Sequence, residues 1–156
     1  MKKTIGMRVA LLAVHLLVLQ VWLHAQRAIT WKDVPGWKSL TGNGAVLSPD
    51  GKWVAYGIAP VEGDGELFLQ KTGDTVLRKY AIGGSSFISM AFSEDGKWFA
   101  FKEAAKSRDQ KAAAKPGGRP VYDNLHIVEL ATGKKTTVEK VSSYAFNGKA
   151  STHIAL

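Results

Sequence analysis

The sequence contains few residues that could carry out nucleophilic catalysis. A serine nucleophile of the α/β-hydrolase type lies in a G-x-S-x-G motif on a sharp turn. The nearest match, Gly83–Phe87 (GGSSF), lacks the last glycine and precedes a strand-like segment, Phe87–Phe92. Beyond residue 25 the histidines are His126 and His153, and each falls in a strand pattern without a recognisable nucleophile partner. We therefore expect the serines to lie in a loop, both histidines to be structural, and no catalytic residue in this chain.

Phosphate, metal and redox chemistry have no motif either. The stretch Lys115–Gly118 lacks the frame of a G-x-x-x-x-G-K-[ST] phosphate-binding loop. The chain has no cysteine, and no cysteine or histidine cluster could hold zinc. Two S-x-D-G turns carry acidic residues, but an EF-hand needs oxygen ligands at alternating positions and a closing glutamate. We therefore expect no cofactor and no metal site.

The elements that position these residues follow an N-terminal export signal. Three basic residues precede an almost wholly apolar run, Val9–Leu23, and the small residue Ala25 follows it. This pattern predicts a secretory signal peptide that is cleaved after Ala25, and an exported protein that is periplasmic or secreted. A retained membrane anchor is the alternative, although the apolar run of about 15 residues is shorter than the roughly 20 that a spanning helix needs.

The remaining residues, 26–156, are enough for one ordinary domain. The chain is 46% hydrophobic and 22% charged, which argues against disorder. Removal of residues 1–25 lowers the formal net charge from +8 to +5, because Lys2, Lys3 and Arg8 are lost. The other basic residues are scattered apart from one local cluster, Lys102–Arg119, so we expect no nucleic-acid partner.

An internal repeat organises the domain. The segments Ala45–Ile58 and Met90–Glu103 share a serine, the sequence Asp-Gly-Lys-Trp and a following alanine, and their glycines, Gly51 and Gly96, are 45 residues apart. A period of this length is typical of a β-propeller blade. The two repeated tryptophans, Trp53 and Trp98, therefore favour packing between blades over stacking on sugars or bases.

Each repeated segment predicts a hairpin between two strands of one blade. Apolar and polar positions alternate after the turn, which is the period of a strand. The serine hydroxyl can cap the turn, and aspartate tolerates the backbone conformation of the next turn position. Glycine accepts the left-handed conformation that closes the hairpin. We expect these residues to be structural rather than ligands: Ser48, Asp50, Gly51, Ser93, Asp95 and Gly96.

A second hairpin follows each of the first ones, so that a blade has four strands. It consists of Glu66–Gln70 and Thr75–Tyr80 in the first unit, and of Leu125–Leu130 and Thr136–Val141 in the second. We place the two blade-like units at about residues 40–85 and 86–142.

The second unit contains an insertion loop at about residues 106–120. It is polar and basic and contains Pro-Gly-Gly, so we expect an exposed loop with a helical turn through Lys106–Ala114. Partner contacts are one role for such a loop, but a solvated insertion without partners is the preferred interpretation.

A third copy starts at Ser143. It keeps the apolar residues and the Asn-Gly-Lys turn but loses the Ser-x-Asp, and His153–Leu156 is expected to form a strand. We therefore predict an all-β fold, an incomplete β-propeller of about two four-stranded antiparallel blades plus the start of a third, after the signal helix. Closed propellers have about four to eight blades, so we expect a truncated part of a longer parent or an assembly of several copies.

The repeat resembles a known class of propeller. Ala45–Tyr56, which contains S-P-D-G-K-W-V-A-Y, followed by strand, Thr-Gly and strand, is similar to the WD40-like repeats of TolB-type and prolyl-oligopeptidase-type propellers. The segments Ile29–Trp37 and Gly44–Trp53 resemble the start of exported bacterial serine peptidases of the prolyl oligopeptidase family. The resemblance covers about residues 26–156.

In that family a propeller filters the access of peptides to a C-terminal α/β-hydrolase domain, which carries the catalytic triad. The resemblance implies that this chain lacks the triad and that its partners are the missing hydrolase domain, the remaining blades and the peptide substrate of the parent. A non-catalytic TolB-like propeller that mediates protein contacts in the cell envelope is the alternative. A third possibility is a small β-protein that oligomerises to cover its sheets.

Overall fold

The computed structural model describes residues 29–148 and 151–156. The predicted signal helix, residues 1–25, lies outside this range. All of the sheets belong to one compact unit, Lys32–Leu156. A 3₁₀-helix, η1 (Trp31–Gly36), precedes the first strand. Neither of the two helices in the described residues is long and apolar enough to cross a membrane.

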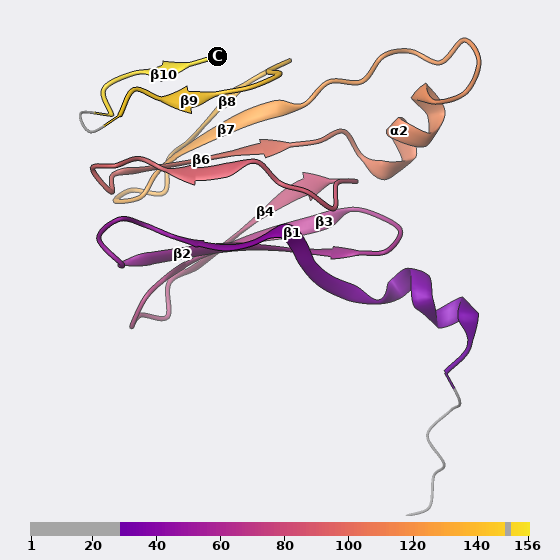
Figure 1. The fold of residues 1–156 in the computed structure, drawn as a ribbon, viewed down its shortest axis with the longest axis horizontal. Coiled ribbons are helices and arrows are strands. Elements are labelled where there is room, and N and C mark those ends of the chain that lie inside the picture. Colours follow the sequence, from indigo (N-terminus) through magenta and orange to yellow (C-terminus); the bar gives the residue numbers. More distant parts are fainter. Residues whose placement is uncertain (1–28, 149–150) are drawn as a thin grey trace, which may run out of the picture. The chain divides into compact units, whose positions relative to one another are not determined.

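The first sheet, sheet A, is an antiparallel meander of four strands in the order β1-β2-β3-β4 (Figure 1). Its strands are β1 (Lys38–Leu47), β2 (Trp53–Pro60), β3 (Gly65–Lys71) and β4 (Leu77–Gly83). Alternate residues of β2 are buried, as expected for a strand with one face on a core. The register of β1 against β2 shifts between Leu40 and Ala45, where the strand has an irregularity.

The second sheet, sheet B, repeats this arrangement in the order β5-β6-β7-β8. Its strands are β5 (Met90–Phe92), β6 (Trp98–Glu103), β7 (Asn124–Glu129) and β8 (Lys135–Val138). The helix α2 (Ser107–Ala113) lies in the connection between β6 and β7, within the predicted insertion. The strand expected at Phe87–Phe92 is shorter, since residues 87–89 are not in a strand. The prediction of an all-β fold is confirmed.

A third, shorter hairpin follows sheet B. It pairs β9 (Ala145–Phe146) with β10 (Ile154–Ala155) in antiparallel fashion. Its register copies the first hairpin of each sheet, because Phe146 lies opposite Ile154 just as Phe92 lies opposite Phe99. The third copy of the repeat therefore has the same hairpin pairing as the first two.

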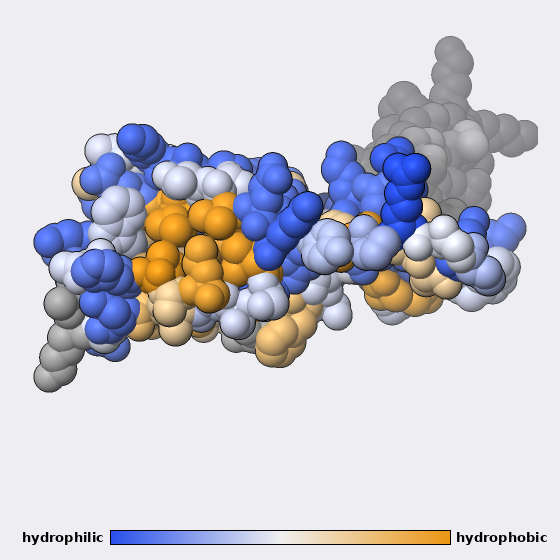
Figure 2. Space-filling model, turned by 90° about the horizontal axis from the view of Figure 1, so that it is seen from above, coloured by the Kyte–Doolittle hydropathy of each residue, from blue (hydrophilic) through white to orange (hydrophobic). Residues whose placement is uncertain are grey.

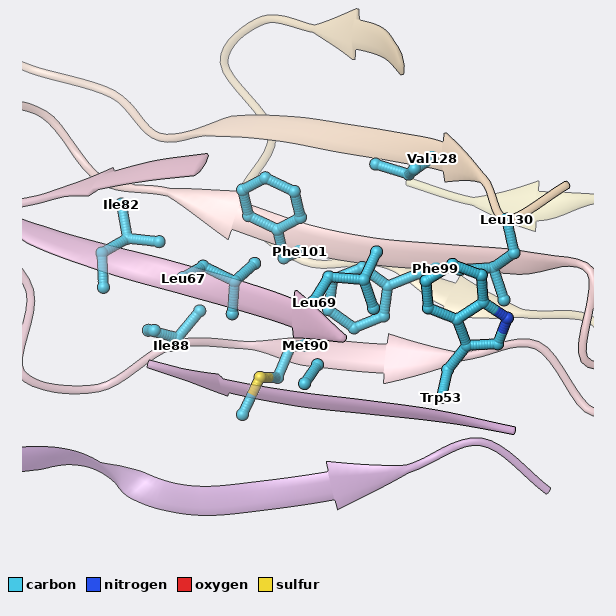
Figure 3. Packing of buried hydrophobic residues seen from close by; sticks show 11 residues of the cluster. Trp53, Leu67, Leu69, Ile82, Ile88, Met90, Phe99, Phe101, Val128 and Leu130 are labelled. Carbon is cyan, nitrogen blue, oxygen red and sulfur yellow. The ribbon is translucent and has the colours of Figure 1, made fainter. Parts of the chain in front are cut away.

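Sheets A and B pack face to face around one hydrophobic cluster (Figure 3). We call the face of sheet A that contacts sheet B its front face, and the facing side of sheet B its back face. Leu67 and Leu69 of sheet A and Phe99 and Phe101 of sheet B are fully buried in this interface. Loss of one of these phenylalanine rings would cost about 3–5 kcal/mol of stability, because the neighbouring side chains could not close the cavity.

The β9–β10 hairpin packs on the other side of sheet B, which we call its front face. A second cluster joins buried Leu125 and Val141 to the partly buried Tyr144, Phe146 and Ile154. Tyr144 also donates a hydrogen bond from its hydroxyl to the carbonyl of Ala100 at 2.9 Å, and burial raises the pKa of this tyrosine to about 12. The third unit thus stacks on sheet B as sheet B stacks on sheet A.

Candidate functional site

The two S-x-D-G-K-W turns have the same hydrogen bonds. In the first, the Ser48 hydroxyl accepts a bond from the backbone N–H of Trp53 at 2.9 Å and donates one to the Asp50 carboxylate at 2.7 Å. In the second, Ser93 makes the equivalent bonds to Trp98 at 2.9 Å and to Asp95 at 2.7 Å. These contacts lie within six residues of chain, so each turn supplies its own polar partners.

The aspartates and glycines of these turns also stabilise the turn through interactions within it. The hydrogen bond from the Ser48 hydroxyl is the largest of the effects that hold the pKa of Asp50 at about 2, and the Ser93 hydroxyl lowers the pKa of Asp95. Gly51 and Gly96 have φ values of 68° and 66°, a conformation that strains other residues. The side chains of these turns thus form hydrogen bonds within their own turn.

The third turn replaces serine by asparagine. The side-chain oxygen of Asn147 accepts a hydrogen bond from the backbone N–H of His153 at 3.1 Å, as the serine hydroxyls do for the tryptophans. The Asn147 N–H also donates to the His153 carbonyl at 3.2 Å. His153 therefore occupies the place of Trp53 and Trp98 in the third unit, a correspondence that the sequence comparison missed because the turn is one residue longer.

The serine segment at Gly83–Phe87 connects the two sheets. The hydroxyl of Ser85 donates to the carbonyl of Phe87 and accepts from its N–H, while the N–H of Gly84 donates to the carbonyl of Ala105 at 3.0 Å. Neither His126 nor His153 has a hydrogen bond to these serines. Among the residues that the structure describes, no histidine forms a nucleophile and base pair with this segment.

His126 has two polar partners that sequence reasoning did not identify. One ring nitrogen contacts the Thr137 hydroxyl at 2.9 Å and the other contacts the Glu103 carboxylate at 2.5 Å. The ring is 4% exposed and lies 5.0 Å from the ring of Phe101. This carboxylate, imidazole and hydroxyl chain has the order of groups that activates a nucleophile.

The strands explain why these three side chains meet. His126 lies directly opposite Phe101 on β6 and Thr137 on β8, and Glu103 is two residues beyond Phe101, so all of them share the back face of sheet B. Buried between the sheets, the imidazole satisfies both of its nitrogens and links three strands. The register of the β7–β8 hairpin is the signal that could have paired His126 with Thr137 in advance.

The insertion is anchored to sheet A rather than freely solvated. Asp64, in the turn between β2 and β3, accepts a hydrogen bond from the N–H of Ser107 at 2.7 Å, and Glu62 pairs with Lys111 at 3.3 Å. The helix α2 has no buried residue, as expected for an exposed insertion, and these two contacts tie it to sheet A. These contacts line a shallow groove of ≈ 590 Å³, whose other charged residues are Arg108 and Lys115.

Among residues 29–148 and 151–156, no three histidine, aspartate or glutamate side chains lie close enough together to hold a metal ion. Comparison of the chain with family models, with curated proteins and with solved structures gave no match.

Proposed function

We propose that this chain forms consecutive blades of a β-propeller in an exported serine peptidase of the prolyl oligopeptidase family. The propeller would control the access of peptides to an α/β-hydrolase domain of the same protein. The observation that carries the proposal is the repeated stacking of units. Phe92 and Phe99 form a tilted ring pair at 4.7 Å in the interface of sheets A and B, and their counterparts Phe146 and Ile154 pack on the front of sheet B.

The local geometry supports blades rather than an isolated sandwich. A sandwich closes after two sheets, whereas here a third hairpin covers the front face of the second sheet in the same orientation. Repetition of one unit that contacts only its neighbours is the arrangement of propellers and related repeat proteins. The export rests on the signal-peptide pattern of residues 1–25, and the peptidase class rests on the resemblance of the segments Ile29–Trp37 and Gly44–Trp53.

A binding role suits the chemistry of the described residues better than a catalytic one. The hydroxyl of Ser85, in the segment Gly83–Phe87, bonds to its own loop, and the buried His126 is held by Glu103 and Thr137. The groove beside α2 has carboxylates from Glu62 and Asp64 and cations from Arg108 and Lys115. Such a mixed-charge surface at the loop end of the strands can contact the termini and side chains of peptides.

Sequencing the transcript beyond the codon for Leu156 tests the proposal. Further S-x-D-G repeats, followed by G-x-S-x-G and a late histidine, are the expected result. A stop codon after a few more repeats, without the nucleophile motif, would favour the TolB-like interaction propeller and reject the peptidase. A purified chain of residues 26–156 should hydrolyse no peptide, and turnover that a serine-directed inhibitor abolishes would contradict the assignment.

A further inference from the structure

A second groove, of ≈ 420 Å³, lies between the insertion and the adjoining ends of β6, β7 and β8. We call it the Tyr122 groove. Its lining comes from residues 103–140 alone and includes Lys106 of the insertion, Tyr122 and Asn124 beside β7, and Lys140 after β8. Figure 2 shows mostly hydrophilic residues at the end of the molecule that carries the insertion, on the right. The groove is therefore a polar site within the second unit of the repeat.

Hydrogen bonds fix the chain on both sides of this groove. The carbonyl of Asp123 accepts a bond from the N–H of Val141 at 3.0 Å. The ammonium of Lys102 pairs with the Asp123 carboxylate at 2.9 Å and donates to the carbonyl of Ser142 at 2.7 Å. Tyr122 and Lys140 are the sequence neighbours of these bonded residues, so their backbone is held in place before any ligand binds. A groove that is formed in advance loses less conformational entropy on binding.

An extra residue in the chain after β8 directs Lys140 toward the groove. Val138 lies opposite Leu125, whereas Val141 bonds to Asp123, so three steps along one chain match two along the other, as in a β-bulge. Lys140 has a φ of 60°, a conformation that favours glycine and strains other residues. In this position its ammonium lies 5.6 Å from the centre of the Tyr122 ring. Strain and bulges of this kind occur where a side chain is aimed at a binding site.

The charged groups of the groove divide into those with partners and those without. The three cations and three carboxylates that line it are Lys106, Arg108, Lys140, Glu103, Asp109 and Glu139. Glu103 contacts His126, and Asp109 contacts Arg108. Among the residues that the structure describes, Lys106 and Lys140 have no ion pair. Two ammonium groups are thus available to an anion.

An apolar surface lies beside these ammonium groups. The side chains of Tyr122 and Val121 line the same groove, and they are 57% and 40% exposed. A ligand that fits has one anionic group next to one apolar group. A polyanion such as a phospholipid surface fits less well, because Glu139 and Asp109 would repel its further charges.

We propose that the Tyr122 groove binds the C-terminal end of a peptide whose last side chain is apolar. Lys106 and Lys140 bind the terminal carboxylate through charge-assisted hydrogen bonds, and the last side chain lies on Tyr122 and Val121. Glu139 accepts a hydrogen bond from a peptide N–H, which a lipid headgroup would not supply. This assignment rests on the proposed function, the handling of peptides, and adds which part of the peptide is recognised.

A short synthetic peptide tests the site. The probe is GSGAL with fluorescein on its N-terminus and a free C-terminal carboxylate, and fluorescence anisotropy with the protein should show saturable binding. The same peptide with a C-terminal carboxamide should bind about tenfold more weakly, because the charge-assisted hydrogen bonds to the lysines are lost. The peptide GSGAG should also bind more weakly, since it has no side chain to cover Tyr122.

Variants of Lys140 separate binding from folding. Lys140→Gln should weaken the binding of GSGAL by about tenfold. Lys134→Gln removes the same charge from the exposed turn between β7 and β8 and should leave the affinity unchanged. Lys140→Gly should weaken binding as much as Lys140→Gln, although its melting temperature should not decrease, because glycine adopts the φ of Lys140 without strain.

Four results would overturn the proposal. These are the absence of saturable binding, equal binding of the carboxamide peptide, equal weakening by Lys134→Gln, and displacement of the peptide by phosphatidylglycerol vesicles, which would make a lipid headgroup the ligand. Binding with the expected pattern would stand even if transcript sequencing found no nucleophile motif. Absence of binding would leave a positive sequencing result intact, so the failure of this proposal and that of the proposed function are distinguishable.

Discussion

Arg78 on β4 donates a hydrogen bond to the carbonyl oxygen of Leu130, which lies 52 residues later in the chain, directly after β7 of the other sheet. The same guanidinium lies over the ring of Trp53. One side chain therefore joins the two sheets by a charge-assisted hydrogen bond and covers the repeated tryptophan at their interface. This contact makes Arg78 a direct test of how much the stacking of units contributes to stability.

The substitution Arg78→Met should lower the free energy of unfolding by about 1–2 kcal/mol, because both the hydrogen bond and the cation–π contact are lost while the apolar stem is kept. Urea unfolding followed by circular dichroism measures the change. Arg108→Met is the matched control, since the side chain of Arg108 is 85% exposed and pairs with its sequence neighbour Asp109. An equal loss in both variants would contradict a role in sheet stacking.

Gly57 on β2 should not tolerate a side chain. A Cβ atom at this position would lie 2.2 Å from the end of the buried Ile88 side chain and 2.8 Å from the methyl group of Thr41. We expect Gly57→Ala to destabilise the protein by about 1–3 kcal/mol through overpacking. Gly36→Ala is the control, because no atom lies within 4 Å of its Cβ position, and its melting temperature should stay close to that of the unchanged protein.

Stability should decrease in acid as the turn carboxylates become protonated. The pKa of Asp50 is lowered from its ordinary value of 3.8 to about 2. A group whose pKa is lower in the folded state binds protons more weakly there. Its contribution to the stability of the fold is therefore complete at pH values above the pKa of the unfolded state. That contribution is lost as the pH falls from about 4 toward about 2, and unfolding in urea at low salt measures it.

The variant Asp50→Asn isolates this contribution. Asparagine keeps an oxygen that can accept the bond from Ser48 but has no carboxyl group to titrate in this range. The decrease in stability between pH 4 and pH 2 should therefore be smaller in Asp50→Asn than in the unchanged protein. Asp109→Asn, on α2, leaves both turn carboxylates in place and should show the full decrease. Identical pH profiles for Asp50→Asn and the unchanged protein would reject the linkage.

Asp64 should control the attachment of the insertion. Asp64→Ala removes the acceptor for the N–H of Ser107, a contact of the type that stabilises a helix start by about 1 kcal/mol. Trypsin should then cleave after Arg108 or Lys111 about fivefold faster, because the opened state is more populated. Asp74→Ala, which breaks the local contacts of Asp74 with Lys71 and with the N–H of Thr75, should leave these cleavage rates unchanged. Equal acceleration in both variants would show that the anchor is elsewhere.

Residue types alone predicted the hairpins of the repeat. The serine, aspartate and glycine of each S-x-D-G turn bond within their own segment, as Ser48 does with Asp50 and Trp53, so their effect can be read from a few neighbouring residues. Alternation of apolar residues likewise predicted antiparallel strands at β2, β3, β6 and β7. The predicted length of β5 and the predicted pairing across the longer third turn were less accurate, because the local sequence pattern does not determine how far the pairing of two strands extends.

Contacts between distant residues depended on the tertiary structure. His126 was recognised as a strand residue, but its position between Glu103 and Thr137 follows from the registers of two strand pairs and from which face packs on sheet A. The polar composition of the insertion predicted exposure and a helical turn, yet only the folded arrangement brings Ser107 to Asp64. The hydrogen bonds within a turn are determined by the residues of that turn. Asp64 and Ser107, in contrast, are 43 residues apart, and Glu103 and His126 are 23 residues apart. These pairs meet only when the packing of the sheets selects one strand register and one face.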